Sequence, residues 1–380
     1  MKVLHVTPAF YPARNWGGFA HSVPGLCAAL ARNPGLELRV LTTDSDGPKT
    51  RKNIPVKAFP EKFPAGYEVY YCRRLFAQSI SLGLLTRLWS MVRWADVVHL
   101  TATYSFPTIP TLLVCRMLRK PVVWSPRGAL QRWQGTTRAR AKSVWERLSN
   151  ALCDPGRVVL HMTSEEEKGE SWPRIPRTQP RVIHNGVNLP GLNGGRSKRN
   201  GSLRLLYLGR LHPIKGIENL LRALVRINGE VTLTLCGDGE RDYRRSLESL
   251  VSELSLQGRV SFRGVIDEAT KARQFLESDL CVVPSFKENF SLVVAESLSY
   301  AVPVVVGDGT PWKQVDQIGC GRCVRNSPDE LAKAIEALSD APLTEMGLRG
   351  RDWMQREFGW DVVAEQMLDT YNEVVKRQSR

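Results

Sequence analysis

Acidic residues are scarce in this sequence, and the apolar run at its amino end is short. The 380 residues include 38 acidic and 53 basic ones, which gives a net charge of +15. This surplus indicates an anionic partner, whether nucleic acid, a phosphate-bearing substrate or an acidic membrane surface. His5 and Pro8 interrupt "MKVLHVTPAFYP", which is therefore neither a signal peptide nor a transmembrane span, and we expect a cytoplasmic protein.

Cysteines are few and mostly isolated. Of the eight, only Cys320 and Cys323 in "GCGRC" form a close pair. A zinc or redox site would need a second cysteine or histidine pair at ligand spacing, and none is present. We therefore expect the cysteines to be small buried hydrophobic residues.

The strand and helix patterns predict an α/β fold with two doubly wound, Rossmann-like domains. Single cores stop growing at roughly 250 residues, so a chain of 380 residues fits two domains. In both halves, short strands rich in valine and leucine alternate with helical stretches, which is typical of parallel sheets. Ligands of such sheets bind at the carboxyl ends of the strands, and the two domains are expected to face each other across a cleft.

The expected boundaries follow from composition. We expect one domain over residues 1–185 and a second, nucleotide-binding one over 186–355, with the linker-like stretch "NLPGLNGGRSKRNGS" near the start of the second. Residues 356–380 contain an amphipathic helix with no strand after it. This helix either closes the second domain or crosses back to the first.

The stretch "PSFKENFSLVVAESLSYA" carries two carboxylates around the start of a predicted helix. Ser291 suits the N-cap of this helix. Glu288 lies in the loop before the helix and Glu296 in its second turn, so at 1.5 Å of rise per residue the two carboxylates lie about 10 Å apart. Between them, backbone N–H groups at the positive end of the helix form an anion site. That site comprises Asn289, Phe290, Ser291 and Leu292. Carboxylates bind hydroxyl groups, so a carboxylate, an anion site and a second carboxylate match the sugar, diphosphate and ribose of a nucleotide sugar. The spacing fits equally well if Glu288 is an ordinary loop acid and Glu296 a solvated helix residue.

Two further motifs favour a phosphate ligand. "YLGRLHPIKGIENLL" places Arg210 and Lys215 beyond a strand and before a helix that Gly216 opens, so both cations can converge on phosphate. In the first domain, Gly17 and Gly18 join the first strand to the first helix, where they would let the backbone approach a ligand closely. A plain turn would also use such a pair.

These motifs together resemble a known enzyme family. "HNGVN", "GRLHPIKGIENLL", "CGDGE", "VSFRGV" and "PSFKENFSLVVAESLSYAVPVV" are similar to the ordered signatures of the retaining family 4 (group 1) glycosyltransferases of the GT-B fold. The resemblance implies a nucleotide-sugar-dependent hexosyltransferase. In it, Glu288 would contact the donor sugar near the reacting centre and Glu296 the ribose, while Arg210 and Lys215 would hold the diphosphate.

The resemblance also has departures. Many members carry "EGFG" where this chain has "ENFS", so Ser291 replaces a glycine. Many have a histidine where Arg127 and Gly128 stand, which makes Arg127 the substitute catalytic candidate. Gly17 and Gly18 would close over the phosphates. "DGTPW" and "GCGRC" resemble a bacterial surface-polysaccharide subgroup, which implies a saccharide or lipid-linked saccharide acceptor, as in lipopolysaccharide assembly.

We expect no metal or other cofactor. Asp44 and Asp46 have the Asp-x-Asp spacing with which a different glycosyltransferase fold binds a divalent cation, but they lie away from the donor motifs. Two rival functions remain open: a nucleotide-sugar epimerase or hydrolase of the same fold, and a basic nucleic-acid-binding protein, for which no reading module is apparent. A dinucleotide-dependent oxidoreductase is disfavoured because "CGDGE" lacks the third glycine.

The first domain has features of a peripheral membrane protein. Residues 116–142 contain eight basic residues and no acidic one. Upstream, the stretch 80–94 sets an apolar stripe at helical spacing, comprising Leu84, Leu85, Leu88, Trp89 and Val92. A basic helix of this kind can lie at an anionic membrane surface, here the inner face of the cytoplasmic membrane. The alternative is that the stripe belongs to the core.

Overall fold

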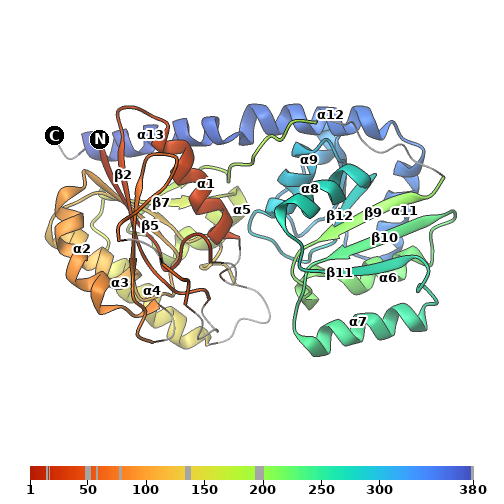
Figure 1. Ribbon diagram of the computed structural model, residues 1–380, viewed down its shortest axis with the longest axis horizontal. Helices are drawn as coiled ribbons and strands as arrows, with labels where there is room; N and C mark the ends of the chain where they lie inside the picture. Colours follow the sequence, from red (N-terminus) through yellow and green to blue (C-terminus); the bar gives the residue numbers. More distant parts are fainter. Residues whose placement is uncertain are drawn as a thin grey trace. The chain divides into compact units, whose positions relative to one another are not determined.

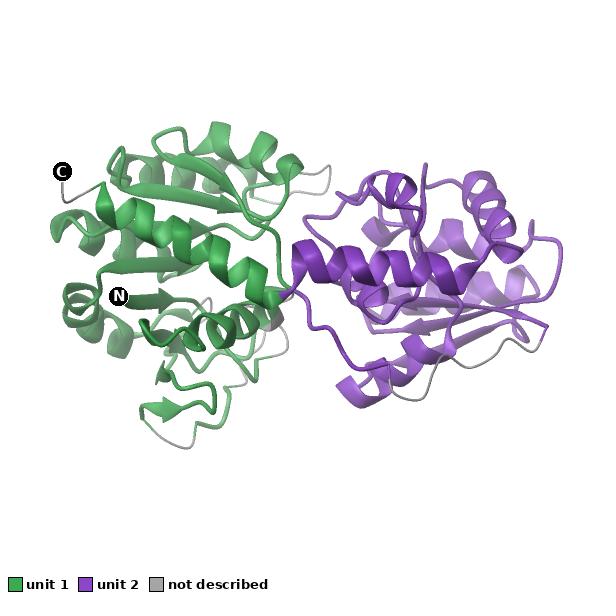
Figure 2. Ribbon diagram, turned by 90° about the horizontal axis from the view of Figure 1, so that it is seen from above, with its two compact units in different colours: residues 1–186, 360–380 green, residues 187–359 purple. Residues whose placement is uncertain are grey.

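The computed structural model describes residues 1–377 except 14, 15, 17, 48–52, 57, 58, 77, 78, 133–137 and 193–200. The chain divides into two compact units (Figure 2). The first comprises residues 1–186 and 360–380, and the second comprises 187–359. Each contains a sheet flanked by helices, as the alternation of strands and helices predicted. No described helix is both long and apolar enough to cross a bilayer.

The sheet of the first unit has the order β3-β4-β2-β1-β5-β6-β7-β8. Figure 1 labels its strands β2, β5 and β7. Every neighbouring pair is parallel except β3 with β4. The strands are β1 (Lys2–Val6), β2 (Glu37–Thr43), β3 (Glu61–Lys62), β4 (Glu68–Cys72), β5 (Val97–Thr101), β6 (Val122–Ser125), β7 (Val158–Met162) and β8 (Gln179–Val182). The valine-rich and leucine-rich strands β1, β2, β5, β6 and β7 are those that the sequence predicted.

Two helical layers cover this sheet. Its helices are α1 (Phe19–Ala31), α2 (Leu82–Trp94), α3 (Thr108–Met117), α4 (Ala139–Leu152), α5 (Glu165–Ser171) and α13 (Trp360–Lys376), with a short 3-10 turn, η2 (Trp172–Arg174). Alternate strand residues pack against α1 and α13 on one face and against α2 and α3 on the other. The C-terminal helix α13 therefore completes the core of the first unit.

The apolar stripe predicted for α2 is divided between core and surface. Leu84, Leu88 and Val92 are fully buried on the side of the helix that faces the sheet. For these three residues the interpretation as core is correct. Leu85 and Trp89 are 38% and 44% exposed. Because a helix turns 100° per residue, a five-residue stripe is wider than the face that the sheet can cover.

The sheet of the second unit is entirely parallel, in the order β11-β10-β9-β12-β13-β14. Its strands are β9 (Leu203–Leu208), β10 (Val231–Cys236), β11 (Val260–Gly264), β12 (Leu280–Val283), β13 (Val304–Gly307) and β14 (Gly321–Val324). Its helices are α6 (Ile217–Leu224), α7 (Arg241–Glu253), α8 (Glu268–Glu277), α9 (Leu292–Ser299), α10 (Val315–Ile318), α11 (Pro328–Ser339) and α12 (Leu343–Trp353), with the turns η3 (Pro213–Lys215) and η4 (Met354–Phe358). Cys323 lies on the edge strand β14 and Cys320 is buried just before it.

A buried chain of polar groups joins α13 to the first sheet. The Tyr371 hydroxyl lies 2.5 Å from Nδ1 of His99, whose Nε2 is 2.6 Å from the Ser125 hydroxyl. That hydroxyl is 2.6 Å from Nδ1 of His161, whose Nε2 is 2.9 Å from the carbonyl oxygen of Ile183. A carbonyl only accepts, and a neutral imidazole donates from one nitrogen. All donors therefore point one way, from Tyr371 towards Ile183.

The buried histidines of the first sheet, His5, His99 and His161, are neutral. His5 stacks on His99 at 4.4 Å between ring centroids, and its Nε2 is 2.8 Å from the Thr101 hydroxyl. Burial, with the nearby Arg127 charge, lowers the pKa of His5 and of His161 to about 3. Burial and the neighbouring rings hold the pKa of His99 well below its usual value. The hydrogen-bond chain therefore keeps its direction throughout the neutral range.

We predict that Tyr371→Phe destabilises the protein by about 1–3 kcal/mol, because it leaves the buried Nδ1 of His99 without a donor. Tyr11→Phe is the control, since Tyr11 is 59% exposed, and it should change stability by less than about 0.5 kcal/mol. Urea unfolding of both variants measures the difference. Equal stabilities would show that the Tyr371 hydroxyl does not hold α13 in place.

Candidate active site

The direction of winding reverses in the second sheet between β9 and β12. From β9 the chain proceeds through β10 to β11, then crosses to β12 on the other side of β9. The loops that follow β9 and β12 therefore diverge from adjacent strand ends, which is where open α/β sheets bind ligands. Arg210 and Lys215 lie in the first of these loops and Glu288 in the second.

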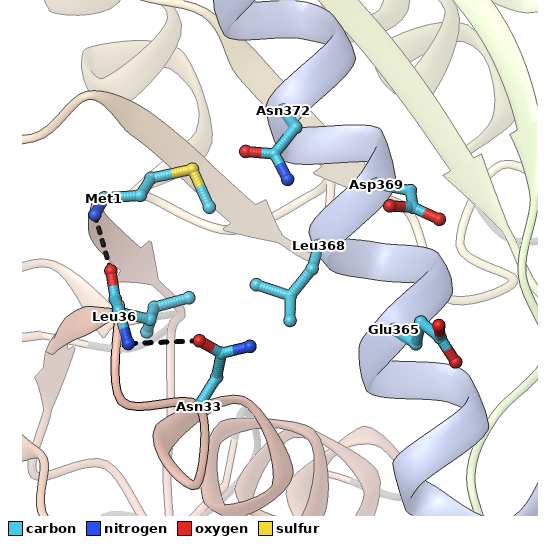
Figure 3. Close-up of a pocket in the computed structure, with 8 residues that line it drawn as sticks. Met1, Asn33, Leu36, Glu365, Leu368, Asp369 and Asn372 are labelled. Atoms are coloured by element: carbon cyan, nitrogen blue, oxygen red, sulfur yellow. Dashed lines mark hydrogen bonds between the residues drawn. The ribbon is translucent and has the colours of Figure 1, made fainter.

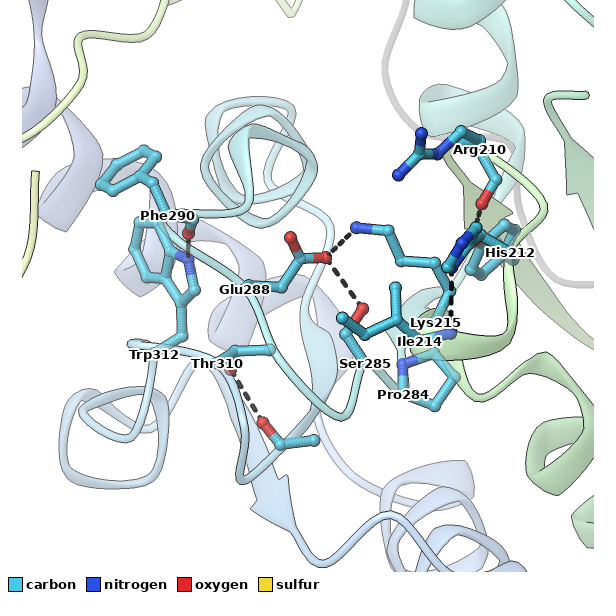
Figure 4. Close-up of polar contacts among 12 residues, drawn as sticks. Arg210, His212, Ile214, Lys215, Pro284, Ser285, Glu288, Phe290, Thr310 and Trp312 are labelled. Atoms are coloured by element: carbon cyan, nitrogen blue, oxygen red, sulfur yellow. Dashed lines mark hydrogen bonds and ion pairs between the residues drawn. The ribbon is translucent and has the colours of Figure 1, made fainter. Parts of the chain in front are cut away.

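Glu288 and Lys215 form an ion pair at this reversal (Figure 4). The Lys215 ammonium donates to Oε1 of Glu288 at 2.5 Å, and the Ser285 hydroxyl donates to the same oxygen at 2.8 Å. The two charged side chains are 20% and 12% exposed, so the pair is mostly screened from water. The sequence predicted both residues in one site but not their direct pairing.

Arg210 lies on the same loop as Lys215 and is exposed. Its backbone carbonyl accepts a hydrogen bond from the Tyr207 hydroxyl at 2.9 Å, which fixes the start of the loop. Within the described part of the chain, the Arg210 guanidinium takes part in no ion pair. Its charge is therefore available to an incoming anion.

Glycines let the loops of the site pack backbone against backbone. Gly216 has φ = +63°, and a Cβ there would lie 1.9 Å from Nδ2 of Asn326 and 2.4 Å from the Pro284 carbonyl oxygen. A Cβ on Gly309 would lie 2.0 Å from the carbonyl oxygen of Phe286. Gly309 in turn accepts a hydrogen bond from the backbone N–H of Glu288 at 3.0 Å. The glutamate loop is thus held between two glycine-containing turns.

Glu296 lies on α9 as predicted, but it has a partner that the sequence did not indicate. Its carboxylate accepts a hydrogen bond from the Lys271 ammonium at 2.7 Å, and Lys271 also pairs with the exposed Glu268 at 2.9 Å. Burial alone would lower the pKa of Lys271, but the two carboxylates outweigh it and raise the pKa. Glu296 is therefore held in place by α8 before any ligand arrives.

The start of α9 corrects the prediction for Ser291. Ser291 precedes the helix, but its side chain makes no capping hydrogen bond because its backbone is left-handed, at φ = +63° and ψ = +77°. An ordinary N-cap has an extended backbone. The left-handed region favours glycine, which the resemblance to family 4 glycosyltransferases implies at this position. The loop therefore keeps the backbone path of a glycine despite the substitution.

The other predicted loop residues divide between core and loop surface. The Phe290 ring is buried against Trp312 at 5.1 Å, and the Trp312 indole donates to the Phe290 carbonyl oxygen. Leu292 packs at the margin of the same core cluster, and Asn289 is partly buried. Phe290 therefore supports the loop from beneath, and only its backbone can face a ligand.

In the first unit, Arg127 and Gly128 follow β6 with left-handed backbones, at φ = +54° and +77°. Arg127 donates to the side-chain oxygen of Asn185, and burial lowers its pKa to about 10 against the opposing effect of Glu167. The Gly128 N–H donates to Glu167 at 2.5 Å. Gly18 is exposed and precedes α1, while Gly17 lies outside the described residues.

A separate hollow in the first unit shares no residue with these groups. It has a volume of about 410 Å³ and is formed by α13, the start of β1 and the turn after α1 (Figure 3). Glu365 and Asp369 on α13 make it acidic, which does not suit a phosphate ligand. Among the described residues, no three histidine, cysteine, aspartate or glutamate side chains form a group that could hold a metal ion.

Two glycosyltransferase family models match the chain in succession. Residues 16–190 match the model "Glycosyltransferase Family 4", and residues 202–341 match "Glycosyl transferases group 1". The first match covers the unit with Arg127, and the second covers the unit with Glu288 and Lys215.

The chain is also similar to individual glycosyltransferases. An uncharacterised glycosyltransferase of Methanocaldococcus jannaschii is 25% identical across the full length of both chains. The D-inositol 3-phosphate glycosyltransferase of Xylanimonas cellulosilytica is 30% identical, but over only 46% of this chain and 43% of its own.

Solved structures show the same fold. Sucrose-phosphate synthase of Thermosynechococcus elongatus superimposes with a TM-score of 0.74 over 98% of both chains, at 22% identity. Anabaena HepE bound to UDP gives a TM-score of 0.72 over 98% of this chain and all of HepE, at 17% identity, and HepE has also been solved with UDP-glucose. The two units therefore define a GT-B fold. The family matches and the full-length relative support glycosyltransferase activity for a chain with this fold.

We predict that Gly216→Ala destabilises the protein more than Gly229→Ala does. Both glycines have positive φ, but a Cβ at Gly229 meets nothing within 4 Å, whereas at Gly216 it meets Asn326 and Pro284. The control, Gly229→Ala, should lose only the about 1–2 kcal/mol of stability that left-handed strain costs. In Gly216→Ala, overpacking should cost about 1–3 kcal/mol more. Urea unfolding measures both, and equal losses would mean that the loops of the site shift easily.

Proposed function

We propose that this glycosyltransferase moves a sugar from a nucleoside diphosphate sugar to an acceptor hydroxyl, with retention at the anomeric carbon. The observation that carries the proposal is the Lys215–Glu288 pair at the reversal of the second sheet, next to the exposed Arg210. The UDP and UDP-glucose bound by HepE support a nucleotide-sugar donor. Retention rests on the sequence resemblance alone.

Each charged group has a role in this reaction. Cleavage of the sugar–phosphate bond leaves negative charge on the diphosphate, which Lys215 and Arg210 neutralise without a metal ion. The Glu288 carboxylate contacts the donor sugar near the reacting carbon. The Glu296 carboxylate, oriented by Lys271, accepts hydrogen bonds from the ribose hydroxyl groups.

The loop before α9 supplies the remaining donor contacts. Backbone N–H groups around the start of the helix bind the phosphates at the positive end of the dipole. In the first unit, Arg127 with Gly17 and Gly18 are the proposed substrate contacts. Arg127 takes the position of the histidine that similar sequences carry, so it offers a permanent positive charge where they offer a titratable ring.

We expect Glu288→Gln to lower kcat at least 100-fold with little change in donor affinity, because the carboxylate acts near the charge that develops in the transition state. Glu296→Ala should mainly raise the donor KM, since the ribose is held equally in the ground and transition states. Lys215→Ala should cost about 2–4 kcal/mol of transition-state stabilisation. Steady-state kinetics with the accepted nucleotide sugar measure all three.

A matched control and a stereochemical assay complete this test. Lys333 is a lysine of the second unit that is 74% exposed, so Lys333→Ala should leave the kinetics unchanged. Unchanged kinetics in all three site variants would exclude this site. Inversion of the anomeric configuration of the product, seen by NMR, would exclude retention.

We also propose that the acceptor is a saccharide carried by a lipid and that the first unit binds an anionic membrane surface. The solvent face of α2 exposes Leu82, Leu85 and Trp89, at 61%, 38% and 44%. Beside it, the Arg87 guanidinium lies over the exposed Phe59 ring, 4.6 Å from its centroid. Apolar side chains among basic ones suit the interface of a membrane with anionic lipids, each basic residue adding about 1 kcal/mol.

We expect the double substitution Leu85→Ser/Trp89→Ser to weaken binding to anionic vesicles at least tenfold, because about 1.5–3 kcal/mol per inserted side chain is lost. Leu348→Ser is the control, since Leu348 is equally exposed, at 46%, but lies in the second unit. Vesicle co-sedimentation at rising salt concentration measures binding. The electrostatic part of the proposal would be contradicted if the wild-type protein did not bind anionic vesicles, or if its binding did not fall as the salt concentration rises.

A further inference from the structure

One histidine fixes the turn that carries Lys215, and no step of the proposed reaction uses it. His212 precedes the 3-10 turn η3 with an extended backbone, at φ = −156° and ψ = +143°. Its ring nitrogen Nδ1 accepts a hydrogen bond from the backbone N–H of Ile214 at 3.2 Å (Figure 4). Its own carbonyl oxygen accepts from the N–H of Lys215 at 2.9 Å. His212 therefore caps the turn, a position at which short polar side chains such as asparagine are usual.

The hydrogen bond at Nδ1 defines the protonation state of the His212 ring. A backbone N–H can only donate, so Nδ1 must accept and carries no proton. The ring is therefore neutral, and its single proton lies on Nε2. A protonated ring donates from both nitrogens, so it cannot cap the turn.

The backbone of Ile214 joins this cap to the glutamate loop. Its N–H donates to the His212 ring, and its carbonyl oxygen accepts from the N–H of Phe286 at 2.9 Å. Phe286 lies two residues before Glu288, whose carboxylate accepts from the Lys215 ammonium at 2.5 Å. The His212 ring, the turn η3 and the glutamate loop are thus connected by hydrogen bonds, and together they hold the ammonium beside the carboxylate.

The segments next to His212 carry charges of both signs. The backbone of Leu211 forms a bridge with Gly239, which brings the loop after β10 beside the start of the turn. The charged residues of this loop, of the loop after β12, of the first turn of α6 and of the loop that contains His212 are Asp238, Glu240, Glu288, Glu218, Arg210 and Lys215. The carboxylates among them can offset the charge of a protonated ring, but they cannot replace the acceptor that Ile214 would lose.

We propose that neutral His212 is the positioning residue of Lys215, and that protonation of His212 loosens the turn and weakens the contact of Lys215 with the diphosphate. The proposal rests on the proposed function, because that function assigns the diphosphate to Lys215. A misplacement of about 1 Å can cost a factor of about 100 in rate. Histidine is the side chain that ordinarily changes its charge between about pH 5 and pH 8. We therefore expect the reaction to slow on the acid side of this range.

The first experiment tests the cap itself and needs no donor. His212→Asn and His212→Leu introduce side chains of similar size, but only asparagine has an acceptor, Oδ1, in place of Nδ1. Hydrogen exchange followed by NMR should show the Ile214 amide exchanging about fivefold to tenfold faster in His212→Leu, and within about twofold of wild type in His212→Asn. The amide of Leu211, which donates to the Asp238 carbonyl oxygen, is the internal control. Equal exchange of the Ile214 amide in all three proteins would overturn the proposal.

A second experiment measures the effect on catalysis. UDP-glucose, GDP-mannose and ADP-glucose are offered as donors, and kcat is measured with the one that the wild-type protein consumes fastest. At about pH 8, His212→Leu should lower kcat about tenfold and His212→Asn no more than about twofold. Towards about pH 5, the wild-type kcat should fall at least about fivefold relative to that of His212→Asn, which has no titrating ring. Parallel pH profiles of these two proteins would contradict the role of His212.

Lys215→Ala separates a failure of this proposal from a failure of the proposed function. If Lys215→Ala keeps the wild-type kcat, or if none of the three donors is consumed, the proposed donor site is wrong and the proposal falls with it. If Lys215→Ala is slow while His212→Leu is as fast as wild type, the donor site stands and the role of His212 is excluded. Adding His212→Leu to Lys215→Ala should slow the reaction no further, because the cap acts through Lys215. A further loss in the double variant would show a general structural effect and would also exclude that role.

Discussion

The candidate donor site depends on the pairing of β12 with β9. This contact reverses the direction of winding, so two loops that are about 70 residues apart in the sequence start from adjacent strand ends. The loops can then approach closely only where side chains are missing, at Gly216 and Gly309. Lys215 and Glu288 meet because their backbones are already fixed by these contacts. A different strand order would separate the ammonium from the carboxylate whatever the local sequence.

The sequence predicted the features that are local. Short valine-rich runs predicted the central strands of both sheets, and the helical pattern placed Glu288 in a loop and Glu296 on α9. It did not predict contacts between distant segments, such as Lys271 with Glu296, because no spacing rule links residues on separate helices. The left-handed backbone of Ser291 was also missed, since serine usually favours an extended N-cap. The periodicity of the apolar stripe predicted the helix α2. It did not predict which residues of the stripe the sheet covers.

In both units, a few carboxylates pair with the cationic side chains near the strand ends. In the second unit, Glu288 and Glu296 each hold one lysine in a fixed position, while Arg210 stays exposed. In the first unit, Glu146 is shared between Arg132 and Arg174. A sequence with more acids would neutralise these cations permanently. The scarcity of acidic residues is therefore seen at the end of β9, where Arg210 takes part in no ion pair with the described residues.

The first unit is discontinuous in the sequence, because α13 supplies part of its core and the Tyr371 end of its histidine chain. During synthesis, residues 1–186 leave the ribosome long before residues 360–376 exist. Until then, α1 covers its part of this face of the first sheet, and the part that α13 covers is exposed. Domains usually fold in the order in which they are made. Here the second unit can fold first, and the unit that starts the chain is the last to be completed.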